Sequence, residues 1–228
     1  MCEVDVIILS NTKDIHYYGL LQRTINTLKW SEDAINFNII IVESNKDYIN
    51  NGYISNNANN IIVPNCEFNY NKFLNIGLQL CKNEWIIIAN NDLIFSKNWL
   101  TKIFNFQKKN NDFLSFSSFE PNWHCHKSLP IKDFYEGYQT AHEITGWCIV
   151  MHKTVLETCH LFDERFAFWY QDNDYAMSIK AKNIKHALIR DSRVYHETSQ
   201  SHKLLGEKEN ELTHMQRDVF LKKWNSCV

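Results

Sequence analysis

A short apolar segment, residues 85–89, ends abruptly in three polar residues, Asn90, Asn91 and Asp92. Such a run, bounded by polar residues, predicts a buried strand of an α/β sheet. Polar groups at the carboxyl end of such a strand lie where open α/β sheets bind ligands. Two oxygen-bearing side chains two residues apart can share one divalent cation. The alternative is an Asx-type turn, in which Asn and Asp bond their own backbone.

Strands and helices are predicted to alternate through the first half of the chain. The predicted strands are residues 4–9, 37–42, 61–63 and 85–89, and the predicted helices are residues 16–30, 71–82 and 96–108, with Ser96 as an N-cap. This alternation implies right-handed crossovers and a mainly parallel sheet in the first half.

The second half of the chain has a different pattern of predicted elements. The predicted elements are strands at 113–119, 145–152 and 186–196, a helix at 172–183, and a C-terminal helix ending at Trp224 after a polar loop. Residues 120–143 are predicted to form a long polar and aromatic loop, and long ordered loops are often functional. We expect a single domain over residues 1–228, in which the second half completes the cleft that the first half begins.

Composition excludes several classes of protein. The chain has 228 residues, 44% of them hydrophobic, and a formal charge of −2, so neither disorder nor general attraction to nucleic acid is expected. Its apolar runs are too short to span a bilayer, and its first residues do not resemble a signal peptide. Seven scattered cysteines suggest free thiols in a reducing compartment. A cytoplasmic location is therefore expected.

Several segments carry a family resemblance through their order. They are DVIILSN (5–11), IIVESN (40–45), NKFLNIG (71–77), EWIIIANND (84–92), TGWCIVM (145–151), LFDERF (161–166), WYQDNDY (169–175), VYHE (194–197) and FLKKW (220–224). In this order they resemble the inverting glycosyltransferases of the GT-A fold, family 2 type. The resemblance implies an α/β, GT-A-like (nucleotide-diphospho-sugar transferase) fold with a mixed, mainly parallel central sheet flanked by helices. It assigns donor binding to residues 1–110, and acceptor binding and catalysis to residues 111–228.

The resemblance also implies a nucleotide-sugar donor with Mn²⁺ or Mg²⁺ on its diphosphate. Residues 90–92 then occupy the Asp-X-Asp position of the family, with Asp92 as the metal ligand and His196 completing the site. A cation there would neutralise charge on the leaving diphosphate. The alternative for His196 is a histidine at a strand end bonded to backbone.

Seven residues are predicted to contact the donor: Ser10, Asn11, Glu43, Lys72, Asn75, Asn90 and Asn91. Glu43 matches an acidic residue that contacts the base in the family. A carboxylate can accept the N3 hydrogen of uracil, which favours a UDP donor. The alternatives are an exposed charge at a strand end for Glu43 and a solvated helix lysine for Lys72.

The resemblance places the general base at Asp172, which would take a proton from the acceptor hydroxyl. The aromatic approach over residues 166–170 would partly desolvate its carboxyl and raise its pKa. The alternative is that Asp172 and Asp174 only stabilise the dipole of a helix, which is the reading we take for Asp174. Acceptor contacts are expected from Trp147, Trp169 and Tyr170, although buried aromatic residues are more often core residues.

Two departures from the family pattern open an alternative function. Asn90 stands where the first Asp of Asp-X-Asp is usual, and Gln171 replaces the usual acid before the base. A non-catalytic nucleotide- or sugar-binding domain descended from a glycosyltransferase is therefore the alternative. The joint presence of Asp92, Asp172 and His196 favours an enzyme.

Other site types fit the sequence less well. A zinc site on residues 123–126 has poor ligand spacing, and there is no Gly-X-Gly-X-X-Gly dinucleotide motif. We therefore expect a metal-dependent inverting hexosyltransferase that moves a sugar from a UDP-sugar to a saccharide acceptor of a glycan or glycolipid. A peripheral contact with a membrane would suffice to reach a lipid-linked acceptor, and no nucleic-acid partner is expected.

Overall fold

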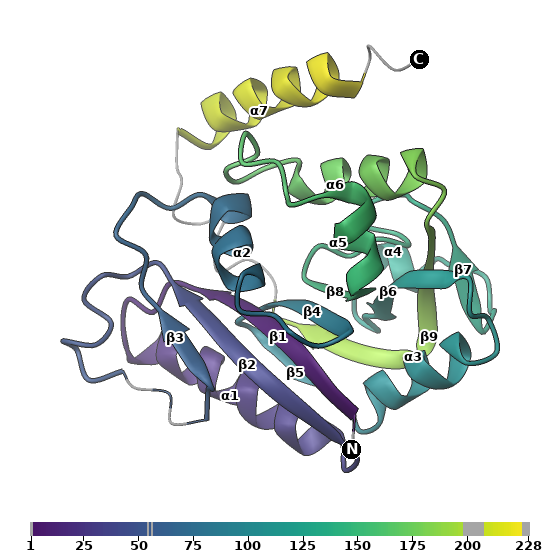
Figure 1. Cartoon of the computed structure of the whole chain (residues 1–228), viewed down its shortest axis with the longest axis horizontal. Coiled ribbons are helices and arrows are strands. Elements are labelled where there is room, and N and C mark those ends of the chain that lie inside the picture. Colours follow the sequence, from purple (N-terminus) through teal and green to yellow (C-terminus); the bar gives the residue numbers. More distant parts are fainter. Residues whose placement is uncertain (1, 54, 56, 198–207, 225–228) are drawn as a thin grey trace.

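A mixed β-sheet forms the centre of the protein (Figure 1). The computed structural model describes residues 2–53, 55, 57–197 and 208–224. The strands are β1 (Cys2–Ser10), β2 (Ile35–Glu43), β3 (Asn60–Ile62), β4 (Trp85–Asn90), β5 (Leu93–Phe95), β6 (Phe113–Phe119), β7 (Phe134–Glu136), β8 (Cys148–His152) and β9 (Lys185–His196). Over the described residues their order is β3-β2-β1-β4-β8-β6-β9-β5, with β7 also paired to β9.

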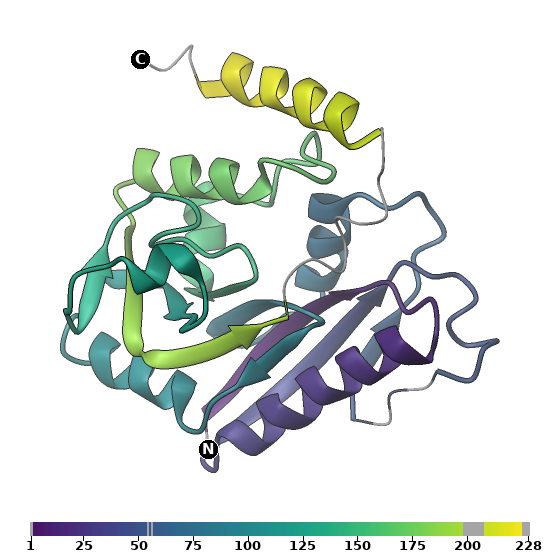
Figure 2. The ribbon, with the colours of Figure 1, turned by 180° about the vertical axis from the view of Figure 1, so that it is seen from behind.

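Helices cover both faces of this sheet, so the fold has three layers (Figures 1 and 2). The helices are α1 (Ile15–Ser31), α2 (Tyr70–Leu78), α3 (Trp99–Gln107), α4 (His124–Lys127), α5 (Lys153–Cys159), α6 (Gln171–Ala181) and α7 (Lys208–Trp224). Residues of α1 and α3 pack in one core cluster, and residues of α2, α5 and α6 pack in the other. The last helix, α7, lies outside these layers beside α6.

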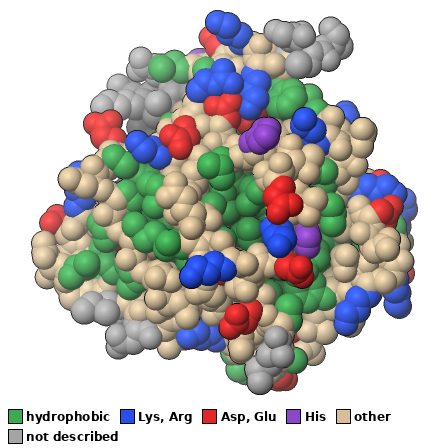
Figure 3. Space-filling view, in the orientation of Figure 1, with side chains coloured by type: hydrophobic (Ala, Val, Ile, Leu, Met, Phe, Trp, Pro, Cys, Tyr) green, Lys and Arg blue, Asp and Glu red, His purple; other side chains and the backbone are tan. Residues whose placement is uncertain are grey.

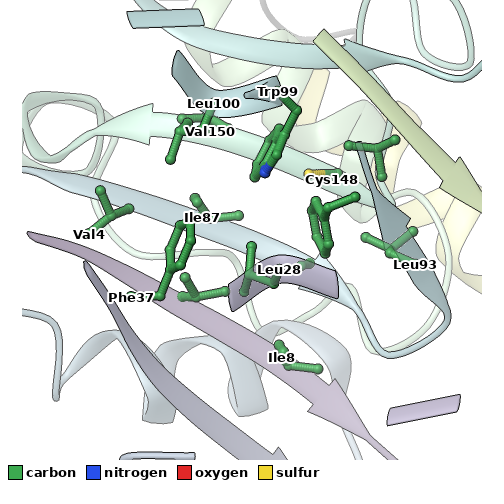
Figure 4. Packing of buried hydrophobic residues seen from close by; sticks show 14 of the residues in the cluster. Val4, Ile8, Leu28, Phe37, Ile87, Leu93, Trp99, Leu100, Cys148 and Val150 are labelled. Atoms are coloured by element: carbon green, nitrogen blue, oxygen red, sulfur yellow. The ribbon is translucent and has the colours of Figure 1, made fainter. Parts of the chain in front are cut away.

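Strand β1 shows why the sequence favours a sheet buried on both faces. Its side chains alternate between the two core clusters, with Val6 and Ile8 in one and Ile7 in the other, all fully buried. Figure 4 shows the first cluster, where strand side chains such as Ile87 lie together with helix side chains such as Leu28 and Leu100. Burial of each such side chain contributes roughly 1.5–3 kcal/mol. A near-continuous apolar run is the expected sequence of such a strand.

One glycine sets how closely α2 approaches the sheet. A Cβ atom on Gly77 would lie 2.8 Å from Cγ2 of Ile7 and 3.2 Å from Cγ2 of Val42. Only a residue without a side chain therefore allows α2 to pack directly on β1 and β2. This close packing brings the start of α2, capped by the Asn69 side chain, toward the carboxyl ends of those strands.

The predicted sheet of the first half is confirmed. Strands β3, β2, β1 and β4 are mutually parallel, and the predicted ranges fall within one residue of the observed strands or inside them. The prediction of Ser96 as an N-cap is wrong, because α3 starts after Asn98, whose φ is 60°. The backbone N–H of Trp99 donates to the carbonyl of Ser96 (3.3 Å), which closes a turn before the helix begins.

The second half contains elements that periodicity did not reveal. The region 120–143, predicted as a loop, contains α4 and β7, and α5 was missed as well. In the first half, β5 was missed. These elements are three to seven residues long, which is too short for a periodic pattern to show. Strand β8 begins at Cys148 because its N–H closes a turn onto the carbonyl of Thr145 (3.1 Å). Most of the polar loop predicted before α7 lies outside the described residues.

Two global expectations are met by the part of the chain that the structure describes. None of its helices is long and apolar enough to cross a membrane. Its cysteines are Cys2, Cys66, Cys81, Cys125, Cys148 and Cys159, and all are free thiols.

Candidate functional site

The carboxyl ends of β1, β2 and β4 meet at one edge of the sheet. In register, Ser10 pairs with Glu43, and the residue before Ser10 pairs with Asn90. The amide Nδ2 of Asn91 donates to Oγ of Ser10 (3.3 Å), which ties the end of β4 to the end of β1. Four of the predicted donor-binding residues are thus neighbours, and Asn11 follows them with an exposed side chain.

Glu43 lies at this edge, and the alternative that its side chain is an exposed charge at a strand end is wrong. Its side chain is fully buried, and its carboxylate accepts hydrogen bonds from the backbone N–H groups of Thr12 (3.0 and 3.2 Å) and Asn45 (2.7 Å). Hydrogen bonds from uncharged N–H groups stabilise a buried carboxylate. Glu43 therefore holds together the loops that follow β1 and β2.

Asp92 and His196 come together where β4 ends and β9 ends. The residue after Asp92 pairs with His196 across β5 and β9, and the N–H of Glu197 donates to the carbonyl of Asp92 (3.0 Å). Nε2 of His196 lies 3.2 Å from Oδ1 of Asp92 and 3.3 Å from Nδ2 of Asn90. An ion pair forms between Asp92 and His196 only when the imidazole is protonated.

The Asp92 carboxylate has chemistry that suits a divalent cation. Its Oδ1 is buried and accepts no hydrogen bond from the described residues, although it faces an imidazole nitrogen. A buried acceptor without a partner is unfavourable unless something else satisfies it. Among the described residues no group of three or more His, Cys, Asp or Glu side chains could hold a metal. The described part of the chain therefore offers two candidate ligands here, Asp92 and His196, and Asn90 stands where a second carboxylate would supply a third ligand.

Helix α1 fixes the backbone next to both of these residues. Oγ1 of the buried Thr24 donates to the carbonyl of Leu93 (3.0 Å) and accepts from its N–H (2.9 Å). Arg23, one residue earlier, forms an ion pair with Glu197. The residues that follow Asp92 and His196 are thus both tied to α1.

Trp147 and Gly146 connect this pair with Asp172. The ring of Trp147 stacks on the imidazole of His196, with centroids 5.1 Å apart and an interplanar angle of 20°. The backbone carbonyl of Trp147 accepts from the N–H of Asn90 (2.9 Å). Gly146 lies against Asp172, because a Cβ atom at position 146 would be 3.2 Å from Oδ2 of Asp172. The metal-ligand candidates and the candidate base therefore belong to one contiguous site.

Asp172 lies in the first turn of α6 with its carboxyl surrounded by protein. Burial raises the pKa of the Asp172 carboxyl, and the hydrogen bond from the Asn173 N–H (2.9 Å) opposes this shift only in part. A narrow pocket beside it is lined by Asn71 and Gln171, among others. Oδ1 of Asn71 and Oε1 of Gln171 are buried and have no hydrogen-bond partner within the described ranges. Asn71 was not predicted as a site residue, although it begins one of the segments that resemble the family, and Gln171 was noted only as a departure.

The two residues predicted on α2 differ in availability. Nδ2 of Asn75 donates to the carbonyl of Phe162 (2.9 Å) and to Oε1 of Glu164 (3.0 Å), and its Oδ1 accepts from the N–H of Phe162 (3.0 Å). Both amide hydrogens of Asn75 are used, so this side chain holds the segment before α6. In this structure it has no free hydrogen with which to bind the nucleotide-sugar donor. Lys72 is partly exposed, and its N–H bonds to the capping side chain of Asn69 (3.0 Å).

The predicted acceptor aromatics occupy two places. Trp147 is in the site, whereas Trp169 and Tyr170 precede α6 and lie toward α7. The ring centroid of Tyr170 is 5.4 Å from that of Phe220 in α7. The N–H of Trp169 donates to Oε1 of Gln216 (2.6 Å). Sequence reasoning missed Gln216, because nothing in the local pattern marks a polar residue of one helix as the partner of a distant loop.

The zinc alternative on residues 123–126 is wrong. Nδ1 of His126 accepts from the N–H of Glu120 (2.8 Å), and its Nε2 donates to the carbonyl of His142 (2.9 Å). Both ring nitrogens are therefore engaged with backbone, and burial lowers the pKa of His126, which keeps it neutral. Trp123 instead packs edge-on against Trp147, with centroids 5.4 Å apart.

Comparisons with known proteins agree with this architecture. The family model described as Glycosyl transferase family 2 matches residues 7–159. A crystal structure of S. aureus TarS is similar in fold, with a TM-score of 0.63 and 15% sequence identity over 86% of this chain. The match covers 37% of the TarS chain, so the present chain spans well under half of that protein. No curated protein matches the chain.

Proposed function

The chain belongs to glycosyl transferase family 2, and from this membership we propose that it transfers a sugar, of the hexose type, from a UDP-sugar to a saccharide acceptor of a glycan or glycolipid. We further propose that the transfer inverts the anomeric centre and depends on a divalent metal. The contiguity of Asp92, His196 and Asp172 through Trp147 and Gly146 is the observation that supports these proposals most strongly.

Asp172 is proposed as the general base. Inversion requires one group that takes the proton from the acceptor hydroxyl on the side opposite the leaving diphosphate. A carboxyl with an ordinary pKa is a weak base near neutral pH, and the raised pKa of Asp172 makes its carboxylate a better proton acceptor. Gly146 has no side chain to separate its backbone from the Asp172 carboxyl.

Asp92 and His196 are proposed to hold Mn²⁺ or Mg²⁺. The buried Oδ1 of Asp92 accepts from no backbone N–H of the described residues and faces His196, so it fits a cation ligand better than an Asx turn. When bound, the ion would supply positive charge beside the leaving diphosphate. Imidazole suits Mn²⁺ less than carboxylate does, but mixed oxygen and nitrogen sites are ordinary.

Donor and acceptor contacts are proposed around this centre. Ser10, Asn11, Asn90 and Asn91 line the carboxyl ends of β1 and β4, where a nucleotide would lie. The remaining proposed donor contacts are Glu43, Lys72 and Asn75, of which Asn75 would first have to release its hydrogen bonds to Phe162 and Glu164. The proposed acceptor contacts are Trp147, Trp169 and Tyr170. The preference for UDP rests on the position of Glu43 in the family pattern. Because its carboxylate is fully buried and accepts from the N–H groups of Thr12 and Asn45, contact with uracil N3–H requires the loops after β1 and β2 to move.

A thermal-shift panel tests the donor and the metal together. UDP, GDP, CDP and dTDP are each added with and without Mn²⁺. A ligand at one hundred times its Kd stabilises the native state by about 2.7 kcal/mol, or roughly 5–10 °C for a chain of this size. We expect this shift with UDP and only when Mn²⁺ is present. If no nucleotide shifts the transition, the non-catalytic alternative replaces the proposed function.

A variant of Asp92 locates the metal. Asp92→Ala should abolish the Mn²⁺-dependent part of the shift, because it removes the only carboxylate proposed as a ligand. Asp191→Ala, which removes an exposed aspartate of β9, serves as the matched control and should retain the full shift. A shift that persists in Asp92→Ala would place the metal elsewhere.

A further inference from the structure

We propose that Gln216 of α7 is a positioning residue that holds the backbone leading into the candidate base Asp172. This inference rests on the proposed function, because it concerns the same site. It assigns α7 to the active-site machinery, although the helix lies outside the three layers of the fold and none of its residues was predicted to take part.

Gln216 accepts two hydrogen bonds from consecutive backbone groups. Its Oε1 lies 3.1 Å from the N–H nitrogen of Phe168 and 2.6 Å from that of Trp169. The side chain is 5% exposed, so these bonds are shielded from water. Two successive N–H groups that converge on one oxygen fix the direction of the chain at this point. Asp172 follows three residues later.

The backbone between these groups and Asp172 has an unfavourable conformation. Tyr170, which precedes the first residue of α6, has φ 61° and ψ 7°, in the left-handed region. A residue with a bulky side chain keeps such a conformation only when its surroundings impose it. The contacts of Gln216 come immediately before Tyr170, and the ring of Phe220, one helical turn after Gln216, packs against the Tyr170 ring.

Helix α7 also holds the residue that follows Asp172 by two positions. Nε1 of Trp224 donates to Oδ1 of Asp174 (2.8 Å), and Nζ of Lys223 lies 3.0 Å from its Oδ2. Lys223 also reaches Asp163, at 2.8 Å. Figure 3 shows basic and acidic side chains next to each other close to α7. Helix α7 therefore contacts the chain both before and after Asp172, while the Asp172 carboxyl itself lies against Gly146.

This arrangement gives α7 a function in catalysis without contact with the reacting atoms. A base that is misplaced by about 1 Å can lose roughly a hundredfold in rate. Loss of the Gln216 bonds should let the segment before α6 relax and admit water to Asp172. The rate should then fall while nucleotide binding at the ends of β1 and β4 is unaffected.

Three variants on one helix test the proposal. Gln216→Ala removes the acceptor, Gln216→Glu keeps an oxygen that can accept both N–H groups, and Met215→Ala changes a neighbouring exposed residue as the matched control. We expect kcat to fall by about 10- to 100-fold in Gln216→Ala, with the Mn²⁺- and nucleotide-dependent thermal shift retained. Gln216→Glu should recover most of kcat, and Met215→Ala should match the wild type.

Two further readouts separate positioning from general destabilisation. The pKa that governs the acidic limb of the kcat/KM profile should move down toward an ordinary carboxyl value in Gln216→Ala. Amide hydrogen exchange at Phe168 and Trp169 should be slow in the wild type and in Gln216→Glu, and fast in Gln216→Ala. The exchange measurement needs no substrate, so it remains informative if the wild type transfers no sugar and the proposed function fails. Unchanged exchange in Gln216→Ala, or equal loss of rate and nucleotide binding, would overturn the role of Gln216.

Discussion

The two halves of the molecule satisfy their buried polar groups in different ways. In the first half, the buried carboxylates of Asp5, Glu32 and Glu43 accept from backbone N–H groups. Asp5, for example, accepts from the N–H groups of Lys82 (2.6 Å) and Asn83 (2.7 Å). In the second half, several buried groups bond one another through their side chains: the Tyr175 hydroxyl bonds Ser115 (2.7 Å), and Ser115 bonds His186 (2.7 Å).

This difference determines what each half of the site depends on. The edge formed by the carboxyl ends of β1, β2 and β4 depends on strand ends and loops, whose backbone groups are present whatever the side chains are. The candidate base depends on particular side chains from distant elements, such as Asn75 of α2 and Gln216 of α7. We therefore expect variants of the first half to change mainly stability, and variants near Asp172 to change mainly rate.

The largest effect is expected at the candidate base. Asp172→Asn should lower turnover by about 10²- to 10⁴-fold with nucleotide binding nearly unchanged, because it removes the proton acceptor. Steady-state kinetics and the thermal shift with UDP and Mn²⁺ measure the two quantities. Asp174→Asn removes the same charge from the same turn and should cost much less rate. Equal losses in the two variants would support the helix-dipole alternative.

The next largest effect is expected on stability in the first half. Asp5→Ala leaves two backbone N–H groups without acceptors and should reduce the free energy of unfolding by about 3 kcal/mol, or roughly 6–12 °C in Tm. Calorimetry measures the change. Asp33→Ala removes an exposed aspartate that pairs with Lys97 (2.6 Å), and it should change Tm very little. If both variants unfold alike, buried carboxylates do not support this half.

The pH dependence of stability should reveal the buried histidine of the second half. Burial lowers the pKa of His186 to about 4, and its Nδ1 accepts from Ser115, so the folded protein keeps it neutral. The unfolded chain binds a proton below about pH 6.5. Stability is therefore lost as the pH falls from about 6.5 to 4, by about 2 kcal/mol between pH 7.5 and pH 5.

Urea denaturation at the two pH values measures this loss. His186→Gln cannot take up the proton and should show a shallower dependence on pH than the wild type. An identical slope in the two proteins would show that other groups account for the loss.

The smallest effect is expected from the exposed ion pair between Arg23 and Glu197. Both side chains are about 40% exposed, at 42% and 39%. Such pairs contribute at most about 1 kcal/mol and are screened by salt. Arg23→Ala should therefore lower stability by less than about 1 kcal/mol and retain the Mn²⁺-dependent shift. Loss of that shift would show that α1 controls the metal site through this contact.

The same contrast explains how much the sequence could predict. Strands β1, β2 and β4 were found because uninterrupted apolar runs such as residues 85–89 are typical of sheets buried on both faces. Family resemblance singled out both Asp92 and His196, and the structure places them 3.2 Å apart, while their role as metal ligands stays a prediction. Glu43 was placed correctly at a strand end, but its complete burial was not foreseen.

What could not be predicted depends on contacts between residues far apart in the chain. Asn75 was assigned to the donor because of its position on a helix, yet its partners lie 87 and 89 residues away. Gln216 had no local signal at all. Short elements such as β5 were hidden for a related reason, because their form comes from pairing with β9 and not from their own pattern.

The pairing of strand β9 limits where chains of this kind can gain or lose residues. It pairs with β6 along its first part and with β5 at its last three residues, which include His196. Alternate residues of a strand point to opposite faces, so one residue inserted just before Val194 would break the alignment of His196 with Asp92. The exposed turn at residues 49–52 bears no such constraint. Evolution is therefore expected to add and remove residues in that turn, and to conserve the spacing within β9.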